Sequence, residues 1–583
     1  MTGRESRRRR AQRLSLVPNF RLRRAALAGL LGASLFAVIW SAFDRQILET
    51  EFLQNEGERR YLRIKEIPAR RGMILDRNGE PLAVSTPVAT VWADPRKLVG
   101  RSQVIRALAE ALGIESKVLR QRLEERSTRA FVYLKRRIGP EQALAVEQVV
   151  ERHGLTDVGM DTEYRRFYPG GEVFGHLTGF TNVDDRGIEG IELAFNAWLG
   201  AEAGKRRVIQ DGRSRLVSEV ERIRPTRHGK DLTLSLDRRL QFLAYRELKR
   251  AVKKHRALAA SAVVLDVASG EVLAMVNQPS YNPNGKLGGE KSARRNRALT
   301  DVFEPGSTVK PFVVAAALEA SIVGPSTPID TSPGTLKVGR NRVKDVRNYG
   351  RLDTTGIITK SSNVGVTKLA LRMDRAVLWQ LYDRLGFGRS AESRFPGEVA
   401  GRLPHYGGWS RFEHATLAFG YGLSVTTLQL AQAYAVLAAD GIKRPVSLLQ
   451  RAEPPPEERV LGADTARKVR EMMETVVSEK GTAKRAAIEG YRVAGKTGTA
   501  KKAVRGGYAA RRYQAVFAGM APVSKPRFVM VVMVDEPRGK HYYGGRVAAP
   551  VFARVMQGAL RLYNVPPDDP GATLLMAGVE DLQ

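Results

Sequence analysis

The chain has 583 residues, too many for one ordinary hydrophobic core, so we expect two or more domains. It contains no cysteine, which excludes disulfides, thiolate catalysis and cysteine-ligated metal sites. Its 95 Lys and Arg against 61 Asp and Glu give a formal net charge of +34. No block of basic residues is interleaved with aromatic residues, so we expect no nucleic-acid partner. We expect instead a basic surface that faces anionic lipid or polymer.

A membrane anchor is predicted near the N-terminus. Residues 25–43 carry no charge, and as a helix they would span roughly 28 Å, close to the hydrocarbon thickness of a bilayer. The first 24 residues hold nine Arg and one Glu, which places that end in the cytoplasm. A cleaved signal peptide, including a twin-arginine one, and a buried core helix are the alternatives. We expect a cytoplasmic basic tail (1–24), a single-pass helix in the inner, cytoplasmic membrane (25–43), and a periplasmic remainder.

Residues 44–228 are predicted to form an α+β domain that begins with a polar stalk at residues 44–62. Asn78-Gly79 lies between two apolar stretches and indicates a β-hairpin with a type I′ turn. Residues 71–79 and 187–192 are its landmarks. Neither carries obvious chemistry, so we interpret both as structural.

Residues 229–563 are predicted to form a second, larger α+β domain, followed by a C-terminal tail at residues 564–583. Asp237 is placed to cap a helix whose apolar positions share one face. Strands are expected near both ends of this domain, with helix-rich sequence between them, so one sheet would be assembled from distant parts of the chain. The expected strands are residues 261–265, 271–276, 513–518 and 527–534.

The first chemical motif is Ser307-x-x-Lys310, just before an apolar run at residues 312–318. Pro305-Gly306 indicates that a helix begins here, and Pro311 is tolerated only near that beginning. Lys310 would then share a helix face with Ser307. A serine hydroxyl needs a neighbouring base, and a buried lysine is pushed toward the neutral form that can act as one. Alone, this motif is a weak signal, because an exposed helix start has the same pattern.

Two further motifs strengthen the interpretation of Ser307 as a nucleophile. Ser361-x-Asn363 offers a second hydroxyl for proton relay and an amide that could hold a substrate carbonyl. The segment Lys496-Thr497-Gly498-Thr499 follows apolar residues and is predicted to be an edge strand, able to pair with an extended peptide while Lys496 attracts a carboxylate. The order S-x-x-K, S-x-N, K-T-G is that of serine acyl-transferases.

A competing motif overlaps the third one. Residues 490–497 match the nucleotide-binding pattern G-x-x-x-x-G-K-[ST]. Such a loop must open a helix, whereas glycines interrupt the segment that follows and a strand is predicted next. We therefore interpret the match as accidental.

With these motifs, the chain resembles the class B penicillin-binding proteins, and most closely their division-specific branch, which makes septal peptidoglycan. The similarity extends to residues 71–79, 187–192, 395–398, 419–423 and 542–552. It implies a penicillin-binding-protein/serine β-lactamase-like transpeptidase domain at residues 229–563 and a non-catalytic pedestal, or dimerisation-like, domain at residues 44–228.

The resemblance also implies the reaction and the role of each residue. Ser307 attacks the D-Ala–D-Ala carbonyl of a stem peptide, Lys310 takes its proton, and an amine of a second stem peptide resolves the acyl-enzyme. Ser361 and Asn363 assist, and β-lactams acylate the same serine. The carboxylate end of the substrate is bound by Lys496, Thr497, Gly498 and Thr499, and the oxyanion by the backbone N–H groups of Ser307 and Thr499.

No metal or organic cofactor is implied. The expected partners are stem peptides, β-lactams, a membrane glycan polymerase of the shape–elongation–division–sporulation family and other division proteins. A β-lactamase or carboxypeptidase would pass the same acyl group to water, but no E-x-x-L-N segment follows Asn363 to supply a deacylating glutamate. A receptor that binds β-lactams without turnover stays open at this point.

Overall fold

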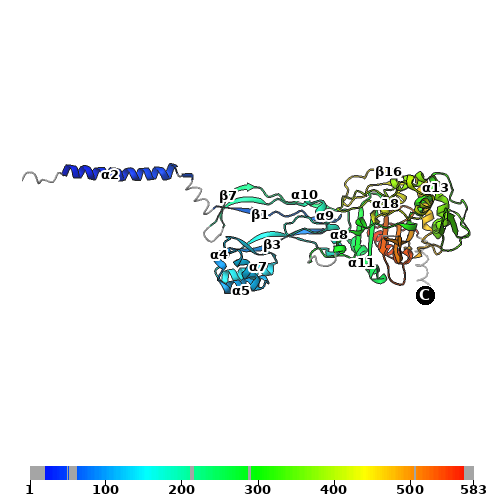
Figure 1. Ribbon diagram of the computed structural model, residues 1–583, viewed down its shortest axis with the longest axis horizontal. Coiled ribbons are helices and arrows are strands. Elements are labelled where there is room, and N and C mark those ends of the chain that lie inside the picture. The colour runs from blue at the N-terminus through cyan, green and yellow to red at the C-terminus, as the bar shows by residue number, and fades with distance from the viewer. Residues whose placement is uncertain are drawn as a thin grey trace, which may run out of the picture. The chain divides into compact units, whose positions relative to one another are not determined.

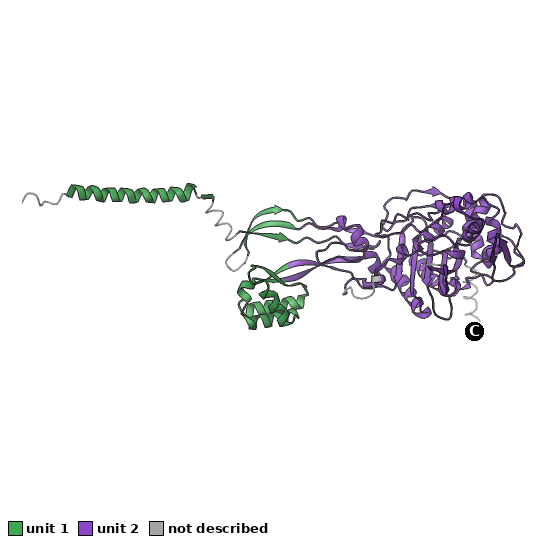
Figure 2. Cartoon of the chain, viewed as in Figure 1, with its two compact units in different colours: residues 1–68, 91–161, 203–226 green, residues 69–90, 162–202, 227–583 purple. Residues whose placement is uncertain are grey.

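The computed structural model describes residues 20–48, 50–51, 62–210, 216–285, 291–504 and 507–569. Most of the expected tails, 1–24 and 564–583, therefore lies outside the described residues. The chain divides into two compact units, shown in different colours in Figure 2. The first comprises Met1–Pro68, Val91–Asp161 and Ala203–Thr226, and the second Ala69–Thr90, Thr162–Glu202 and Arg227–Gln583.

Helix α2 (Phe20–Phe43) contains the predicted membrane segment (Figure 1). None of its residues is buried, and a short π-helical turn (Asp44–Leu48) extends it. By length and composition it is able to cross a membrane. Its apolar residues 25–43 are all exposed, as expected of a helix that lies in lipid.

The rest of the first unit combines a small sheet with a group of helices. Strands β1 (Leu62–Ile67), β6 (Gly204–Gln210) and β7 (Leu216–Arg224) pair antiparallel in that order. Helix α5 (Ser102–Leu112) packs on its neighbours through buried leucines and ends at Gly113, whose left-handed conformation suits a C-cap. The other elements are α4 (Pro95–Leu98), α6 (Ser116–Glu124), β4 (Val132–Ile138) and α7 (Pro140–Arg152).

The predicted hairpin at Asn78-Gly79 is confirmed, but its turn type is not. Strand β2 (Ile74–Leu75) pairs antiparallel with the start of β3 (Pro81–Ala93). A type I′ turn needs positive φ at both central residues, whereas here only Gly79 has it, at +84°. The carboxylate of Asp76 accepts hydrogen bonds from the backbone of Asn78 (2.8 Å) and Glu80 (2.9 Å). This Asx-type bonding accompanies the absence of a positive φ at Asn78.

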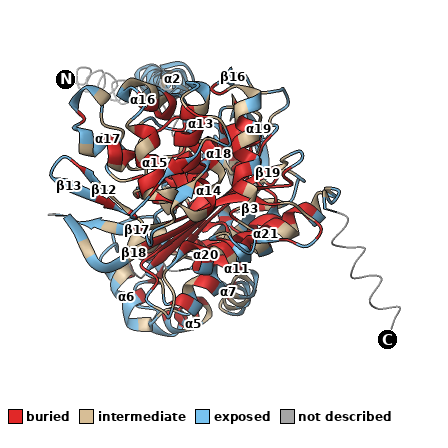
Figure 3. Ribbon diagram, turned by 90° about the vertical axis from the view of Figure 1, so that its right-hand side faces the viewer, coloured by how far each residue is buried: buried red, intermediate tan, exposed pale blue. Residues whose placement is uncertain are grey.

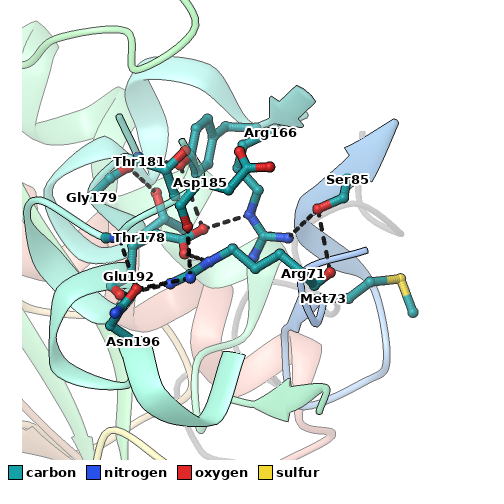
Figure 4. A network of polar contacts seen from close by, with 12 residues as sticks. Arg71, Met73, Ser85, Arg166, Thr178, Gly179, Thr181, Asp185, Glu192 and Asn196 are labelled. Carbon is teal, nitrogen blue, oxygen red and sulfur yellow. Dashed lines mark hydrogen bonds and ion pairs between the residues drawn. The ribbon is translucent and has the colours of Figure 1, made fainter. Parts of the chain in front are cut away.

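A buried ionic network joins the two landmark segments of the second unit (Figure 4). Glu192, fully buried, accepts from Arg71 Nε through one carboxylate oxygen and from Arg166 Nε through the other, both at 2.6 Å. Arg71 also donates to Asp185 O and to Asn196 Oδ1, each at 2.9 Å. Arg71 of residues 71–79 and Glu192 of residues 187–192 neutralise each other's charge. This ion pair gives both segments the structural role that the sequence predicts.

The large sheet of the second unit has the order β10-β9-β19-β18-β17, all antiparallel. Its strands are β9 (Ala259–Asp266), β10 (Val272–Gln278), β17 (Ala494–Val504), β18 (Gly507–Ala521) and β19 (Phe528–Asp535). Strands more than 200 residues apart therefore form one sheet, as predicted. Helix α11 (Arg238–His255) precedes it, and Asp237 caps this helix by accepting from Arg239 N at 2.9 Å.

Helices cover the sheet and enclose the core (Figure 3). Helices α11 and α21 (Ala549–Leu562) pack on each other and on the sheet, while α18 (Thr427–Ala438) packs on strands β9 and β19. Residues of β9, β10 and β19 are buried along their whole length, which a sheet covered on both faces requires.

The remaining elements of the second unit are shorter. They are β5 (Val158–Phe167, which begins in the first unit), α8 (Gly175–Thr178), α9 (Gly190–Ala194), α10 (Asn196–Leu199), β8 (Leu232–Thr233), α12 (Arg297–Thr300), α13 (Lys310–Glu319), β11 (Ile329–Asp330), β12 (Thr335–Val338), β13 (Asn341–Lys344), β14 (Arg351–Leu352), α14 (Thr354–Lys360), α15 (Asn363–Ala370), α16 (Arg375–Arg384), α17 (Arg411–Leu417), β15 (Ile442–Lys443), β16 (Glu458–Arg459), α19 (Ala463–Glu474) and α20 (Gly544–Val547).

Replacing Glu192 with alanine should destabilise the second unit by about 3–5 kcal/mol, because two buried guanidinium groups lose their carboxylate. Urea unfolding of the detergent-solubilised chain measures this. Glu80→Ala is the control: it removes an ion pair with Arg238 whose partners are both about half exposed, and should cost no more than about 1 kcal/mol. Equal losses in the two variants would contradict a structural role for the buried network.

Candidate active site

Ser307 lies in a 3-10 turn (η4, Gly306–Val309) that leads directly into helix α13. Pro311 occupies the first turn of that helix, as the sequence predicts. Ser307 is half-buried, and its hydroxyl has no hydrogen-bond partner among the described residues, whereas Lys310 is fully buried. A Cβ on Gly420 would lie 2.2 Å from Gly306 O, so only glycine allows this loop to approach the turn.

Lys310 contacts both polar residues of the second motif. Its Nζ donates to Ser361 O at 2.5 Å and to Asn363 Oδ1 at 2.7 Å, and lies 3.3 Å from Ser361 Oγ. These acceptors fix the position of the Lys310 amine beside the second motif. Burial, followed by the charge of nearby Lys496, holds the pKa of Lys310 well below its usual range, and the opposing effect of Asp345 is smaller.

Lys496 reaches the same hydroxyl from the sheet. Its Nζ donates to Ser361 Oγ at 2.9 Å and lies 3.2 Å from Thr497 O. It is fully buried, and burial lowers the pKa of Lys496 to about 7. The hydroxyl of Ser361 therefore lies between two amines whose pKa values are both lowered by burial. Such an arrangement can pass a proton between groups.

The S-x-N segment is held in place by Asp345, which the sequence analysis missed. The carboxylate of Asp345 accepts from the backbone of Asn363 and Val364 and, at 2.6 Å, from the hydroxyl of Ser362. Ser361 has a positive φ of 59°, so the loop is strained between α14 and α15 and needs such support. Asp345 follows strand β13, 17 to 19 residues before the residues that it binds, and nothing in its sequence context indicates these contacts.

The K-T-G segment lies on β17, which is the edge strand of the sheet, as predicted. A Cβ on Gly498 would lie 2.9 Å from Pro305 O, so this glycine lets the strand pass close to the turn that bears Ser307. Thr497 Oγ1 bonds to Thr482 Oγ1 at 2.8 Å, and Thr499 Oγ1 accepts from Gly544 N at 3.1 Å. Because Lys496 lies inside a strand, the segment cannot form a nucleotide-binding loop, which requires a helix.

The structure thus brings the three motifs together. Ser361, Asn363, Lys310 and Lys496 are directly hydrogen-bonded, and Ser307 lies in the turn against which Gly498 packs. Acyl transfer to or from a peptide requires a nucleophile, a base and a surface that pairs with the peptide. Ser307, the buried Lys310 with its lowered pKa at the start of the next helix, and the edge strand can supply these.

Comparisons with known proteins agree with this chemistry. The family described as "Penicillin binding protein transpeptidase domain" matches residues 260–557, and "Penicillin-binding Protein dimerisation domain" matches residues 66–234. The peptidoglycan D,D-transpeptidase FtsI of Escherichia coli K12 is 44% identical over 93% of this chain and 91% of its own length. The probable peptidoglycan D,D-transpeptidase PbpC of Pseudomonas aeruginosa is 40% identical over 90% of this chain and 92% of its own.

A solved structure is similar as well. The apo transpeptidase domain of Burkholderia pseudomallei penicillin-binding protein 3 is 45% identical, covers 57% of this chain and 97% of its own length, and superposes with a TM-score of 0.54.

Asp345→Ala should slow covalent labelling by a fluorescent β-lactam by at least about tenfold, because the backbone of Asn363 and the hydroxyl of Ser362 lose the anchor that orients this loop. The rate of label incorporation into purified protein is the measurement. Asp374→Ala removes a carboxylate that caps α16 in the same way and contacts none of the three motifs. A rate loss shared by both variants would mean that the effect is only one of helix capping.

Proposed function

The chain belongs to the penicillin-binding protein transpeptidases, and we propose that Ser307 is the nucleophile with which it performs their reaction. It is a division-type peptidoglycan D,D-transpeptidase, which cross-links the stem peptides of the septal wall through a serine acyl-enzyme and is covalently inhibited by β-lactams. The convergence of Lys310 and Lys496 on one serine hydroxyl, beside the turn that bears Ser307, is the observation that carries the residue assignment.

In the acylation step, neutral Lys310 accepts the proton of Ser307 as the serine oxygen attacks the D-Ala–D-Ala carbonyl. The proton then passes to the departing amine of the terminal D-Ala, and the Ser361 hydroxyl offers the relay because both lysines reach it. The amide of Asn363, fixed by Lys310 on one side and by Lys344 O on the other, is placed to hold the peptide.

The edge strand provides the binding surface for the donor peptide. Backbone groups of Thr497 to Thr499 pair with it, and Lys496 attracts its terminal carboxylate. The backbone N–H groups of Ser307 and Thr499 stabilise the oxyanion, an effect worth about 3–4 kcal/mol per donor. The close packing of Gly498 on the turn supports this pairing of donors, because it brings the two segments to van der Waals distance.

The acyl group passes to an amine of a second stem peptide, or to water in a minor carboxypeptidase reaction. The N-terminus is cytoplasmic and both domains are periplasmic, which the unburied apolar helix α2 and its basic N-terminal flank support. A membrane glycan polymerase of the shape–elongation–division–sporulation family and other division proteins are the partners. Recovery of such a polymerase with the tagged chain from solubilised membranes tests this partnership.

Ser307→Ala should abolish labelling by a membrane-impermeant fluorescent penicillin added to spheroplasts, while unaltered protein is labelled from outside. The substitution removes only one oxygen and leaves the amount of membrane-inserted protein unchanged. Gel fluorescence measures the labelling, and immunoblotting of membranes measures the amount of inserted protein. Labelling of the variant would refute Ser307 as nucleophile, and wild-type protein labelled only after membrane lysis would refute the orientation.

The preference for a penicillin over its carboxylate methyl ester should fall about tenfold between pH 7 and pH 8.5. Burial lowers the pKa of Lys496 to about 7, so its cation is present below that pH and is lost above it. Acylation rates of the two compounds give the ratio at each pH. The arginine of the Lys496→Arg variant keeps its charge throughout this range, so the ratio of the two acylation rates in this variant should not change with pH. A wild-type ratio that is also independent of pH would contradict carboxylate binding by Lys496.

A further inference from the structure

Four exposed basic side chains of the second unit form what we call the basic surface, which has no part in the chemistry described so far. They are Lys254 in the last turn of α11, Arg485 in a short 3-10 turn (η6, Lys484–Ala486), Lys540 in the loop after β19, and Arg546 in α20. The four segments are far apart in sequence, so only the fold brings these charges together.

Backbone bonds and packing hold the four segments next to one another. The loop after β19 is fixed to the end of α11, because His255 O accepts from Arg538 N at 2.9 Å and from Gly539 N at 2.8 Å. Helix α20 packs against η6, and Arg546 Nη1 lies 3.4 Å from His541 Nε2. The four charges act on that same ring: burial lowers the pKa of His541, and so do the charges of Arg546, Lys540, Arg485 and Lys254.

The protein itself does not neutralise the basic surface. No Asp or Glu of the described residues forms an ion pair with any of its four side chains. Basic residues next to them do have acidic partners, since Lys484 pairs with Glu479 at 2.8 Å and Arg538 with Glu536 at 3.2 Å. Exposed charges of one sign that lie together repel each other and attract an anionic ligand. This is a surface of the kind that the net charge of +34 predicts.

The basic surface adjoins the strand on which the donor peptide is proposed to bind. Gly544 N donates to Thr499 Oγ1 at 3.1 Å, and a Cβ on Gly545 would lie 3.4 Å from Thr497 Cγ2. Arg546 follows these two glycines directly in α20. A polymer that places one of its peptides on the K-T-G strand therefore has the basic surface beside it, on the side of α20.

We propose that the basic surface binds the carboxylates of stem peptides that neighbour the donor peptide on the same glycan strand, and so holds the strand between successive cross-links. The inference rests on the proposed function, because it assumes that the donor peptide lies on the K-T-G strand. Every stem peptide that has not been cross-linked ends in a carboxylate, so a new strand is a polyanion. Single exposed ion pairs are weak, but several contacts to one strand add together. The continuity with the peptide-binding edge through α20 favours the strand over an anionic membrane.

The test measures equilibrium binding of the full-length protein, in non-ionic detergent at about 0.15 M salt, to immobilised glycan strands polymerised from lipid-linked pentapeptide. Ser307 is first acylated with penicillin, so that the active site itself does not bind the strand. Replacing the whole basic surface (Lys254→Gln, Arg485→Gln, Lys540→Gln and Arg546→Gln) should raise the dissociation constant about tenfold, because four weak contacts are lost together. Lys254→Gln with Lys540→Gln, which leaves α20 and η6 unaltered, should raise it about threefold.

Two further ligands identify the group that is bound. Unaltered protein should bind about tenfold more weakly to strands whose carboxylates have been converted to amides, because this change removes the negative charge and keeps the rest of the polymer. Vesicles of anionic phospholipid are the second ligand. The basic N-terminal tail is present in every variant, so its contribution to binding cancels in each comparison.

The matched control removes the same net charge from four other segments, at exposed basic side chains without an ion pair among the described residues: Arg372→Gln, Arg411→Gln, Lys525→Gln and Arg561→Gln. Its dissociation constant should stay within about twofold of the wild-type value. Unchanged binding in either basic-surface variant, an equal loss in the control, or undiminished binding to the amidated strands would each overturn the proposal. A loss confined to the vesicles would also overturn it, in favour of a membrane. A penicillin label that maps to a residue other than Ser307 would instead overturn the proposed function.

Discussion

Two lysines buried around one serine hydroxyl are the interaction on which this active site depends. Moving an ammonium ion out of water into a protein interior is so costly that the group loses its proton instead, unless an acid pairs with it. Lys310 and Lys496 form no ion pair among the described residues, and Ser361 satisfies both by hydrogen bonding. The apolar helix α13 and the fully buried central strands exclude water from these amines, which lowers the pKa of both.

The rest of the second unit can be understood as support for this arrangement. Lys310 comes from the start of a helix, Ser361 from a strained connection between helices, and Lys496 from a sheet edge. Three elements from separate parts of the chain must keep their positions to within a fraction of an ångström for the proton to move. Strand pairing fixes Lys496, and the carboxylate of Asp345 fixes the loop between the helices.

Much of this could be predicted from sequence because the signals are local. Apolar runs and turn signals predicted four strands of the sheet, and the K-T-G segment was predicted as its edge strand. An S-x-x-K pattern before an apolar run predicted a helix start. Contacts between residues that only the folded chain brings together leave no local pattern in the sequence. Asp345 is an ordinary acid in sequence, and only the structure shows that its carboxylate holds the loop that contains Ser362 and Asn363. The turn at Asn78 was mistaken because Asp76, two residues earlier, competes for its backbone.

The close packing around the K-T-G strand has a consequence for drug resistance. Lys310 and Lys496 are fully buried, and a Cβ on Gly498 would lie 2.9 Å from Pro305 O. Almost any substitution at these positions would therefore damage the physiological reaction as much as the capture of an antibiotic. Selection by β-lactams should instead favour changes at exposed positions, such as Val346, which follows Asp345. We expect the substitutions that arise under such selection to change exposed loops near the active site and to leave its buried residues unchanged.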